Sequence, residues 1–151
     1  MQTTVKELMR ANPETISPNS SLKEAAQKME SIDCGVLPVS EEESTEEGGE
    51  SGIMGIITDR DIVLRAVAQG KDVTKEKVRD YMTQQVFYCG EDDTLEDAAK
   101  VMHEHHVNRL VVKNKSGRMC GILSFGCILR KDSRMQEIHK VLECTVGKKA
   151  A

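Results

Sequence analysis

Apolar residues recur along this chain in two helical patterns with the same spacing. The first places them at i, i+3, i+4 and i+7, one face of an α-helix, and consists of Leu22, Ala25, Ala26 and Met29. The second consists of Leu95, Ala98, Ala99 and Met102. A hydroxyl residue stands before each pattern with an acidic residue three positions later, as Ser21 with Glu24 and Thr94 with Asp97. This spacing predicts that each pair caps its helix through reciprocal bonds to free backbone N–H groups.

Short apolar runs bounded by polar residues predict the β-strands. Two runs follow each helix and predict an antiparallel hairpin, over residues 36–39 with 53–57 and 110–112 with 119–123. A further strand is expected before each helix, near residues 15–17 and 86–89. A closing helix is expected from about Asp59 and from about Phe125. Each half of the chain therefore has the predicted order β-α-β-β-α.

An internal repeat relates the two halves. "VKELM" at 5–9 and "VRDYM" at 78–82 lie 73 positions apart, and the same offset superimposes the two helix patterns. "GIITDRDIVLR" from Gly55 matches "GILSFGCILRK" from Gly121 at an offset of 66. The first copy therefore carries seven extra residues, which lie in the acidic stretch "SEEESTEEGGES".

The repeat predicts an α+β fold of two β-α-β-β-α units packed with pseudo-two-fold symmetry, sheet against sheet with the helices outside. One unit of about 60 residues would bury too little surface to be comfortably stable alone. The predicted divisions are a first repeat at 1–70, a linker with the second repeat at 71–132, and a tail at 133–151. The acidic segment 40–52 is interpreted as a solvated hairpin loop, with a cation or partner site as the alternative. The tail is expected to be helical, with an apolar stripe that covers its own core or a second subunit.

Composition narrows the classes of function. The chain has 151 residues and a formal net charge of −4, which makes binding to nucleic acid unlikely. The five cysteines form no C-x-x-C pair, which argues against a disulfide scaffold or a zinc site and favours buried free thiols. No apolar run approaches the roughly 18 residues that span a membrane, and the charged N-terminus is unlike a signal peptide. A cytoplasmic protein is therefore expected.

Four segments of the first copy carry a family resemblance, namely "TVKELM", "SLKEAAQKM", "GVLPV" and "GIITDRDI". They resemble the cystathionine-β-synthase (CBS) domain. Two in tandem resemble a CBS pair, or Bateman module, of the kind found as small stand-alone bacterial proteins. The resemblance implies an adenosine-containing ligand in the cleft between the copies, with AMP, ADP, ATP and S-adenosylmethionine as candidates. It also implies assembly as a homodimer.

Thr58 and Asp61 stand where the second hairpin strand gives way to a helix, and their spacing has two interpretations. Thr-x-x-Asp is a capping-box spacing that stabilises a helix by about 1 kcal/mol. In CBS domains with this pattern, the resemblance implies that the threonine contacts a ligand phosphate and the carboxylate accepts both ribose hydroxyls. The second copy has "SFGC" at 124–127 in this place, without a carboxylate. One good site and one weak or vacant site, with Ser124, are therefore expected.

The resemblance implies two further walls for that site. One precedes the first helix and consists of Thr15, Ile16 and Pro18. The other begins the first hairpin and offers backbone groups to the adenine edge, from Gly35, Val36, Leu37 and Pro38. Gly35 has no Cβ and would allow close approach. For Ile16, Val36 and Leu37, ordinary core packing is the alternative.

Basic residues of the second copy have competing interpretations. Arg109 lies where a helix gives way to a strand, a region that in the family often contacts phosphates, which a guanidinium binds through paired hydrogen bonds. A structural salt bridge is the alternative for Arg109. "MHEHHVNRL" holds His103, His105 and His106 but lacks the H-E-x-x-H spacing of a zinc protease. We interpret these histidines as surface or helix-end residues and assign no metal, with a metal site or a phosphate contact from His106 as alternatives.

Together these features favour a regulatory binding module that senses an adenosine-containing small molecule and passes its occupancy to an unidentified partner protein. The alternative is a ligand-free module that assembles as a dimer, binds a partner protein and uses Thr58 and Asp61 only as a helix cap. An enzyme is not expected. The sequence has no paired nucleophile and base, no glycine-rich phosphate loop of the P-loop kind and no complete set of metal ligands.

Overall fold

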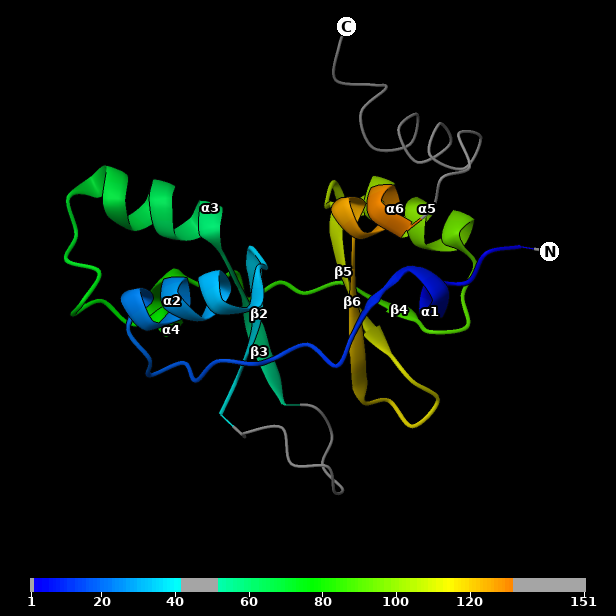
Figure 1. Ribbon diagram of the computed structural model, residues 1–151, viewed down its shortest axis with the longest axis horizontal. Coiled ribbons are helices and arrows are strands. Elements are labelled where there is room, and N and C mark those ends of the chain that lie inside the picture. The colour runs from blue at the N-terminus through cyan, green and yellow to red at the C-terminus, as the bar shows by residue number, and fades with distance from the viewer. Residues whose placement is uncertain (1, 42–51, 132–151) are drawn as a thin grey trace, which may run out of the picture. The chain divides into compact units, whose positions relative to one another are not determined.

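The computed structural model describes residues 2–41 and 52–131 (Figure 1). Most of the predicted acidic loop and the whole predicted tail lie outside these ranges. The helices are α1 (Val5–Leu8), α2 (Leu22–Ile32), α3 (Asp59–Asp61), which continues as a π-helical turn η1 (Ile62–Ala66) and a 3₁₀ turn η2 (Val67–Gln69), α4 (Val78–Tyr81), α5 (Leu95–His105) and α6 (Phe125–Lys131). The strands are β1 (Arg10–Ala11), β2 (Val36–Ser40), β3 (Ile53–Thr58), β4 (Tyr88–Gly90), β5 (Arg109–Lys113) and β6 (Met119–Ser124). The predicted α+β fold is confirmed.

Both predicted hairpins are confirmed. β2 pairs antiparallel with β3, and Val36 lies opposite Thr58. β5 pairs antiparallel with β6, and Arg109 lies opposite Ser124. This pair of the second copy corresponds to Val36 and Thr58 of the first. β4 runs parallel to β5 and is the strand expected before the second long helix.

The strand expected before α2 is reduced to one parallel bridge, between Ile16 and Val39. In the second copy the Glu91 N–H extends the equivalent ladder by donating to the Lys113 carbonyl oxygen at 3.0 Å. Pro18 stands at the position of Glu91 in the first copy. Because proline has no N–H to donate, the ladder is shorter there.

The helix caps follow the sequence in part. At α2 the Glu24 N–H donates to Ser21 Oγ at 3.1 Å and the Ser21 N–H donates to the Glu24 carboxylate at 2.8 Å, so the reciprocal cap is confirmed. At α5 the Asp97 N–H donates to Thr94 Oγ1 at 3.1 Å. The Asp97 carboxylate, however, accepts the Thr94 hydroxyl rather than its N–H. One of the two bonds predicted at α5 is therefore present.

The apolar faces of the two long helices pack as predicted, with one exception. All four residues of the α5 pattern are buried, and so are Leu22, Ala25 and Met29 of α2. Ala26 is exposed, so its assignment to the buried face was wrong. The buried stripe of α2 is narrower than that of α5, because it includes only one residue of the Ala25–Ala26 pair.

The described chain forms two compact units, each with its own hydrophobic core. One unit is Glu14–Val86, where α2, α4 and the β2–β3 hairpin surround a core that includes Leu22, Leu37 and Ile57. The other combines residues 2–13 with the described residues from 87 onward. Its sheet has the strand order β1-β6-β5-β4, and its core includes Leu95, Met102 and Leu110.

The two copies exchange their N-terminal segments. β1 precedes the first copy in the sequence, yet it pairs with β6 of the second copy, with Arg10 opposite Ile122. Conversely, Thr83 follows α4 at the start of the second copy and pairs with Ile56 of β3. The compact units are therefore composed differently from the linear divisions at 1–70 and 71–132, which stay a prediction about the sequence repeats.

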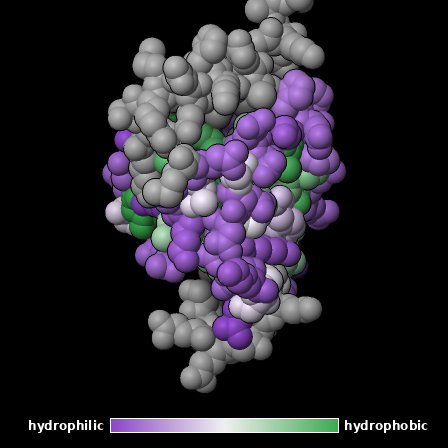
Figure 2. Space-filling model, turned by 90° about the vertical axis from the view of Figure 1, so that its right-hand side faces the viewer, coloured by the Kyte–Doolittle hydropathy of each residue, from purple (hydrophilic) through white to green (hydrophobic). Residues whose placement is uncertain are grey.

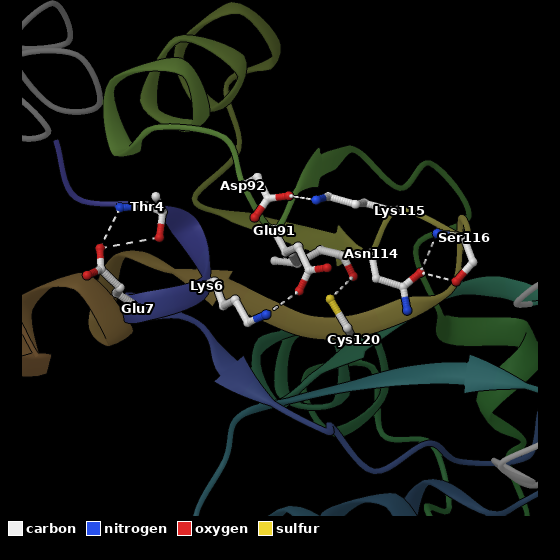
Figure 3. Close-up of polar contacts among 10 residues, drawn as sticks. Thr4, Lys6, Glu7, Glu91, Asp92, Asn114, Lys115, Ser116 and Cys120 are labelled. Atoms are coloured by element: carbon white, nitrogen blue, oxygen red, sulfur yellow. Dashed lines mark hydrogen bonds and ion pairs between the residues drawn. The ribbon is translucent and has the colours of Figure 1, made fainter.

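Contacts around α1 show how the exchanged N-terminal segment is held (Figure 3). The Val5 N–H donates to the Asp93 carbonyl oxygen at 2.9 Å, and Lys6 Nζ lies 3.4 Å from the Glu91 carboxylate. Ion pairs near the surface contribute little stability, about 0–1 kcal/mol. Because Val5 and Leu8 are buried in the core of this unit, their burial accounts for most of the stabilisation of α1.

The face of the molecule in Figure 2 is mostly hydrophilic, with hydrophobic residues in small patches. Among the described residues, none of the helices is both long enough and apolar enough to cross a membrane. The large hydrophobic side chains that are exposed are Met54, Val63, Leu64, Val67 and Leu129. Three of these lie together on η1 and η2, after α3.

Candidate functional site

Thr58 and Asp61 form a closed cap at the end of β3. The Asp61 N–H donates to Thr58 Oγ1 at 3.1 Å, and the Thr58 N–H donates to Asp61 Oδ2 at 3.0 Å. The capping interpretation is therefore confirmed. Thr58 is buried and Asp61 is half-buried. Only Oδ2 of the carboxylate is committed to the cap, so a ligand contact through Oδ1 is compatible with an intact helix start.

Gly35 brings the start of β2 against the same helix start. The Asp59 N–H donates to the Gly35 carbonyl oxygen at 3.0 Å, and the next residue, Val36, lies opposite Thr58. A Cβ added at Gly35 would lie 2.7 Å from Asp59 Oδ2, so a larger residue here would make the exposed Asp59 carboxylate shift. The sequence predicted a close approach at Gly35 but assigned it to a ligand. The sequence analysis did not predict the contact between Asp59 and Gly35, although two acidic residues in the first helical turn were a signal for it.

The predicted wall before α2 lies farther along β2. The Ile16 N–H donates to the Pro38 carbonyl oxygen at 3.0 Å, and the Ser40 N–H donates to the Ile16 carbonyl oxygen at 3.0 Å. These bonds place Ile16, and with it Thr15, beside the end of β2, whereas Thr58 lies beside its start. All the predicted site residues of the first copy nevertheless belong to one compact unit.

Core packing accounts for part of both walls. Leu37 is fully buried in the core of Glu14–Val86, and Ile16 packs in the same core. The core-packing alternative is therefore confirmed for these two side chains. Val36 is also buried, and Pro18 is buried with its carbonyl oxygen accepting the Arg79 N–H at 3.0 Å.

The second copy repeats the cap without the carboxylate. The Cys127 N–H donates to Ser124 Oγ at 3.2 Å, and the Phe125 N–H donates to the Asn108 carbonyl oxygen at 3.1 Å, as Asp59 does to Gly35. The Ser124 hydroxyl in turn donates to Cys127 Sγ at 3.2 Å. The helix start therefore keeps its geometry when a thiol replaces the carboxylate.

Arg109 lies in the second compact unit, at the position that Val36 holds in the first. One of its guanidinium nitrogens donates to Asn108 Oδ1 at 3.3 Å. Within the part of the chain that the structure describes, Arg109 forms no ion pair. The salt-bridge alternative thus finds no support there, and the phosphate contact stays a prediction.

The three clustered histidines lie at the end of α5. His105 stacks on Phe87 with ring centroids 4.0 Å apart, and His103 meets His106 edge-on at 6.4 Å. His106 is the C-cap of α5 with a left-handed backbone, at φ 54°. Among the described residues there is no group of three or more His, Cys, Asp or Glu side chains that could hold a metal ion.

The cysteines within the described ranges are free thiols. Burial raises the pKa of the Cys89 thiol to about 12, and the negative charge of Asp93 adds to the effect. Burial also raises the pKa of the Cys120 thiol. The thiolate is the nucleophilic and metal-binding form of cysteine, so neither side chain is suited to chemistry at neutral pH.

The sequence pattern of the CBS domain matches residues 5–67 and again residues 78–134. The chain belongs to the CBS-domain family. The two matches confirm the tandem CBS pair that the repeat predicted. Each match begins at the segment that the two units exchange, α1 for the first and α4 for the second, so these segments are part of the CBS domain.

Known proteins of similar size share this CBS pair. The CBS domain-containing protein YhcV of Bacillus subtilis is 33% identical over 122 residues, which are 81% of this chain and 80% of that protein. Hypoxic response protein 1 of Mycobacterium tuberculosis is 29% identical over 128 residues, which are 85% of this chain and 84% of that protein.

Solved structures agree with the fold. The crystal structure of hypoxic response protein I, with two coordinated zinc ions, has a TM-score of 0.64 at 29% identity and covers 85% of this chain and 98% of that chain. A hexameric CBS-CP12 protein from bloom-forming cyanobacteria has a TM-score of 0.72 at 25% identity and covers 87% of this chain and 69% of that chain. Both similarities extend over most of this chain.

Proposed function

We propose that the chain is a regulatory module that binds an adenosine-containing ligand, of the AMP, ADP, ATP or S-adenosylmethionine class, where β2 starts and β3 ends. The observation that carries the proposal is the meeting of Gly35–Val36 with Thr58–Asp61 in one compact unit. Proteins built from CBS pairs are regulatory and often bind small ligands, which supports a sensing role.

The chemistry of this turn suits a ribose. A carboxylate accepts hydrogen bonds from two neighbouring hydroxyls, as the acidic residue of dinucleotide-binding folds does with ribose. Asp61 Oδ1 is outside the cap and is the group assigned to this role. Thr58 Oγ1 accepts the Asp61 N–H, which leaves its own hydroxyl proton to donate to the ligand. Asp59 adds a second negative charge on the same turn, so a ribose is favoured there over a phosphate.

Sensing requires that the ligand bind two states of the module differently. A ligand shifts a conformational equilibrium only by the difference between its affinities for the two states. The Asp61 carboxylate is shared between the ligand and the first turn after β3, so occupancy acts directly on the start of α3. A partner protein would detect this change by binding one of the two states more tightly.

Calorimetric titration of the full chain with AMP, ADP, ATP, NAD and S-adenosylmethionine tests the proposal. We expect saturable binding of at least one ligand, and loss of about 10- to 100-fold in affinity in Asp61→Asn, because a charge-assisted hydrogen bond contributes about 1.5–3 kcal/mol. Asp97→Asn is the matched control, since Asp97 caps α5 in the other unit. No binding by any of the five at millimolar concentration would contradict the proposal.

An assembly module without a small ligand is the second candidate, and one observation favours it. Val63, Leu64 and Val67 are 52%, 44% and 56% exposed on the turns that follow α3. Contiguous exposed apolar groups mark interaction surfaces. This apolar face would be covered by a second copy of the chain in a homodimer or by a partner protein. The two candidates are compatible, because the face and the cap lie on successive turns.

A further inference from the structure

A separate pocket of about 280 Å³ lies in the unit Glu14–Val86, on the flank of α2. Its charged residues are Glu24, Lys28 and Glu41, and its serines are Ser17, Ser20 and Ser40. Ligand sites commonly measure about 300–1,000 Å³, so this pocket suits a molecule smaller than a nucleotide. It lies beside the end of β2, whereas the Thr58 cap lies beside the start of β2, about 13 Å away at about 3.3 Å per residue. The pocket and the Thr58 cap are therefore at opposite ends of β2, although Thr15 and Ile16, two residues predicted for the adenosine site, line this pocket.

Lys28 supplies the positive charge of the pocket. Its Nζ donates to the Thr15 carbonyl oxygen at 2.5 Å and lies 3.8 Å from the Glu14 carboxylate. An ammonium group has three N–H donors. Because these contacts use two donors at most, a third remains for an anionic group on a ligand.

Glu24 and Glu41 supply the negative charges. One oxygen of Glu24 accepts the Ser21 N–H, and the cap leaves the other oxygen available. Glu24 and Lys28 have the i,i+4 spacing that favours an ion pair on a helix, as Lys100 forms with Glu96 at 3.7 Å in α5. No ion pair joins Glu24 to Lys28 in the described part of the chain, since Lys28 turns to Thr15 and Glu14. The opposite charges are thus held apart at the pocket.

The second copy fills the corresponding place. Thr15, Lys28 and Ser40 are replaced, at the offset of 73, by Tyr88, Val101 and Lys113. Lys113 Nζ lies 3.9 Å from the centroid of the Tyr88 ring, so a cation–π pair occupies this corner. The repeated fold therefore does not impose an open polar pocket here. The pocket comes from side chains that only the first copy has.

We propose that this pocket binds a small zwitterion with one carboxylate and one ammonium group, that is, a free α-amino acid. Lys28 takes the carboxylate, Glu24 and Glu41 take the ammonium group, and the hydroxyls of Ser17 and Ser20 satisfy remaining polar atoms. A polyphosphate is disfavoured, because two carboxylates face one ammonium group. The described chain also has no cluster of three metal-ligating side chains.

The test is a protein-observed NMR titration of the full chain with each of the twenty standard amino acids. For at least one of them we expect saturable shifts of the backbone amides of Ser17, Ser20 and Ser40. The corresponding amino-acid amide and N-acetyl derivative each lack one charge and should bind about 10- to 100-fold more weakly. The proposal is overturned if no amino acid shifts these amides, or if both derivatives bind as tightly as the parent.

Variants separate this pocket from the rest of the chain. Lys28→Gln and Glu41→Gln should each weaken binding about 10-fold or more. Lys23→Gln, an exposed residue of the same helix outside the pocket, and Asp61→Asn should leave binding unchanged. Glu41 is exposed, so Glu41→Gln should leave the core intact. This variant therefore still tests the proposal if Lys28→Gln unfolds the protein. Unchanged binding in Glu41→Gln and in a folded Lys28→Gln would also overturn the proposal.

Discussion

Ile56 and Thr83 exchange both of their backbone hydrogen bonds. The Ile56 N–H donates to the Thr83 carbonyl oxygen at 3.0 Å, and the Thr83 N–H donates to the Ile56 carbonyl oxygen at 2.8 Å. Ile56 belongs to the hairpin of the first CBS repeat, whereas Thr83 belongs to the segment that opens the second. Arg10 lies opposite Ile122 in an antiparallel pairing of the other unit. Each compact unit is thus completed by a segment of the other repeat.

This exchange predicts which fragments fold. Residues 14–86 contain the whole first core, with α4 and the Thr83 pairing, so this fragment should fold, but with a lower melting temperature than the full chain. Residues 1–70, the linear first repeat, lack α4 and leave the edge of β3 unpaired, so they should be largely unfolded. Circular dichroism with thermal melting of both fragments checks this. A folded 1–70 beside an unfolded 14–86 would contradict the exchange.

Gly55 is predicted to be essential to the same pairing. A Cβ added at this position would lie 2.5 Å from the Thr83 carbonyl oxygen, a backbone atom that cannot move without loss of the bridge. Gly55→Ala should therefore lower the free energy of unfolding by about 1–3 kcal/mol. Gly52→Ala is the control, because nothing lies within 4 Å of its added Cβ. Equal urea midpoints for the two variants would show that the close approach is not present in solution.

The raised pKa of the buried Cys89 thiol predicts that the folded protein loses stability at alkaline pH. Its pKa is about 12 in the folded protein against an ordinary value of 9.0. Above pH 9 the unfolded chain loses the thiol proton while the folded chain keeps it, so the free energy of unfolding falls as the pH rises toward 12. The loss should reach about 1.4 kcal/mol at about pH 10. Urea unfolding at about pH 8 and pH 10 should show this decrease in the wild type and a smaller one in Cys89→Ala; equal decreases would refute it.

The apolar face on η1 and η2 predicts a subunit contact. Leu64→Glu places a charge among Val63 and Val67 and should weaken self-association at least 10-fold, since burying one such side chain contributes about 1.5–3 kcal/mol. Light scattering coupled to gel filtration measures the change. Met54→Glu, at a similarly exposed apolar residue away from this face, should leave the mass unchanged. A wild-type chain that is monomeric at all concentrations would exclude the contact.

The elements of this fold could be predicted from sequence because their signals are local. Short apolar runs bounded by polar residues predicted the two hairpins, and Ser21 with Glu24 predicted the start of α2. The exchange of segments could not be predicted in this way. An offset shows that two stretches are copies, but it does not show which copy's strand a segment such as Thr83 will pair with.

At the site, spacing predicted the bonds between Thr58 and Asp61 but not the environment of the turn. Gly35 was expected to allow close approach of a ligand, which stays a prediction, and the spacing did not indicate that the Asp59 carboxylate lies beside it. Leu37 was a candidate wall residue and lies fully in the core. Such outcomes depend on contacts between segments distant in sequence, for which a single sequence carries no periodic signal.

The central claim is that Asp61 holds the ribose hydroxyls of an adenosine ligand. The most direct measurement is the affinity of ATP and of 2′,3′-dideoxy-ATP for the wild type and for Asp61→Asn. The wild type should bind ATP about 10- to 100-fold more tightly than the dideoxy analogue, and the variant should show little difference between the two. Equal affinities of the wild type for the two nucleotides would contradict the claim.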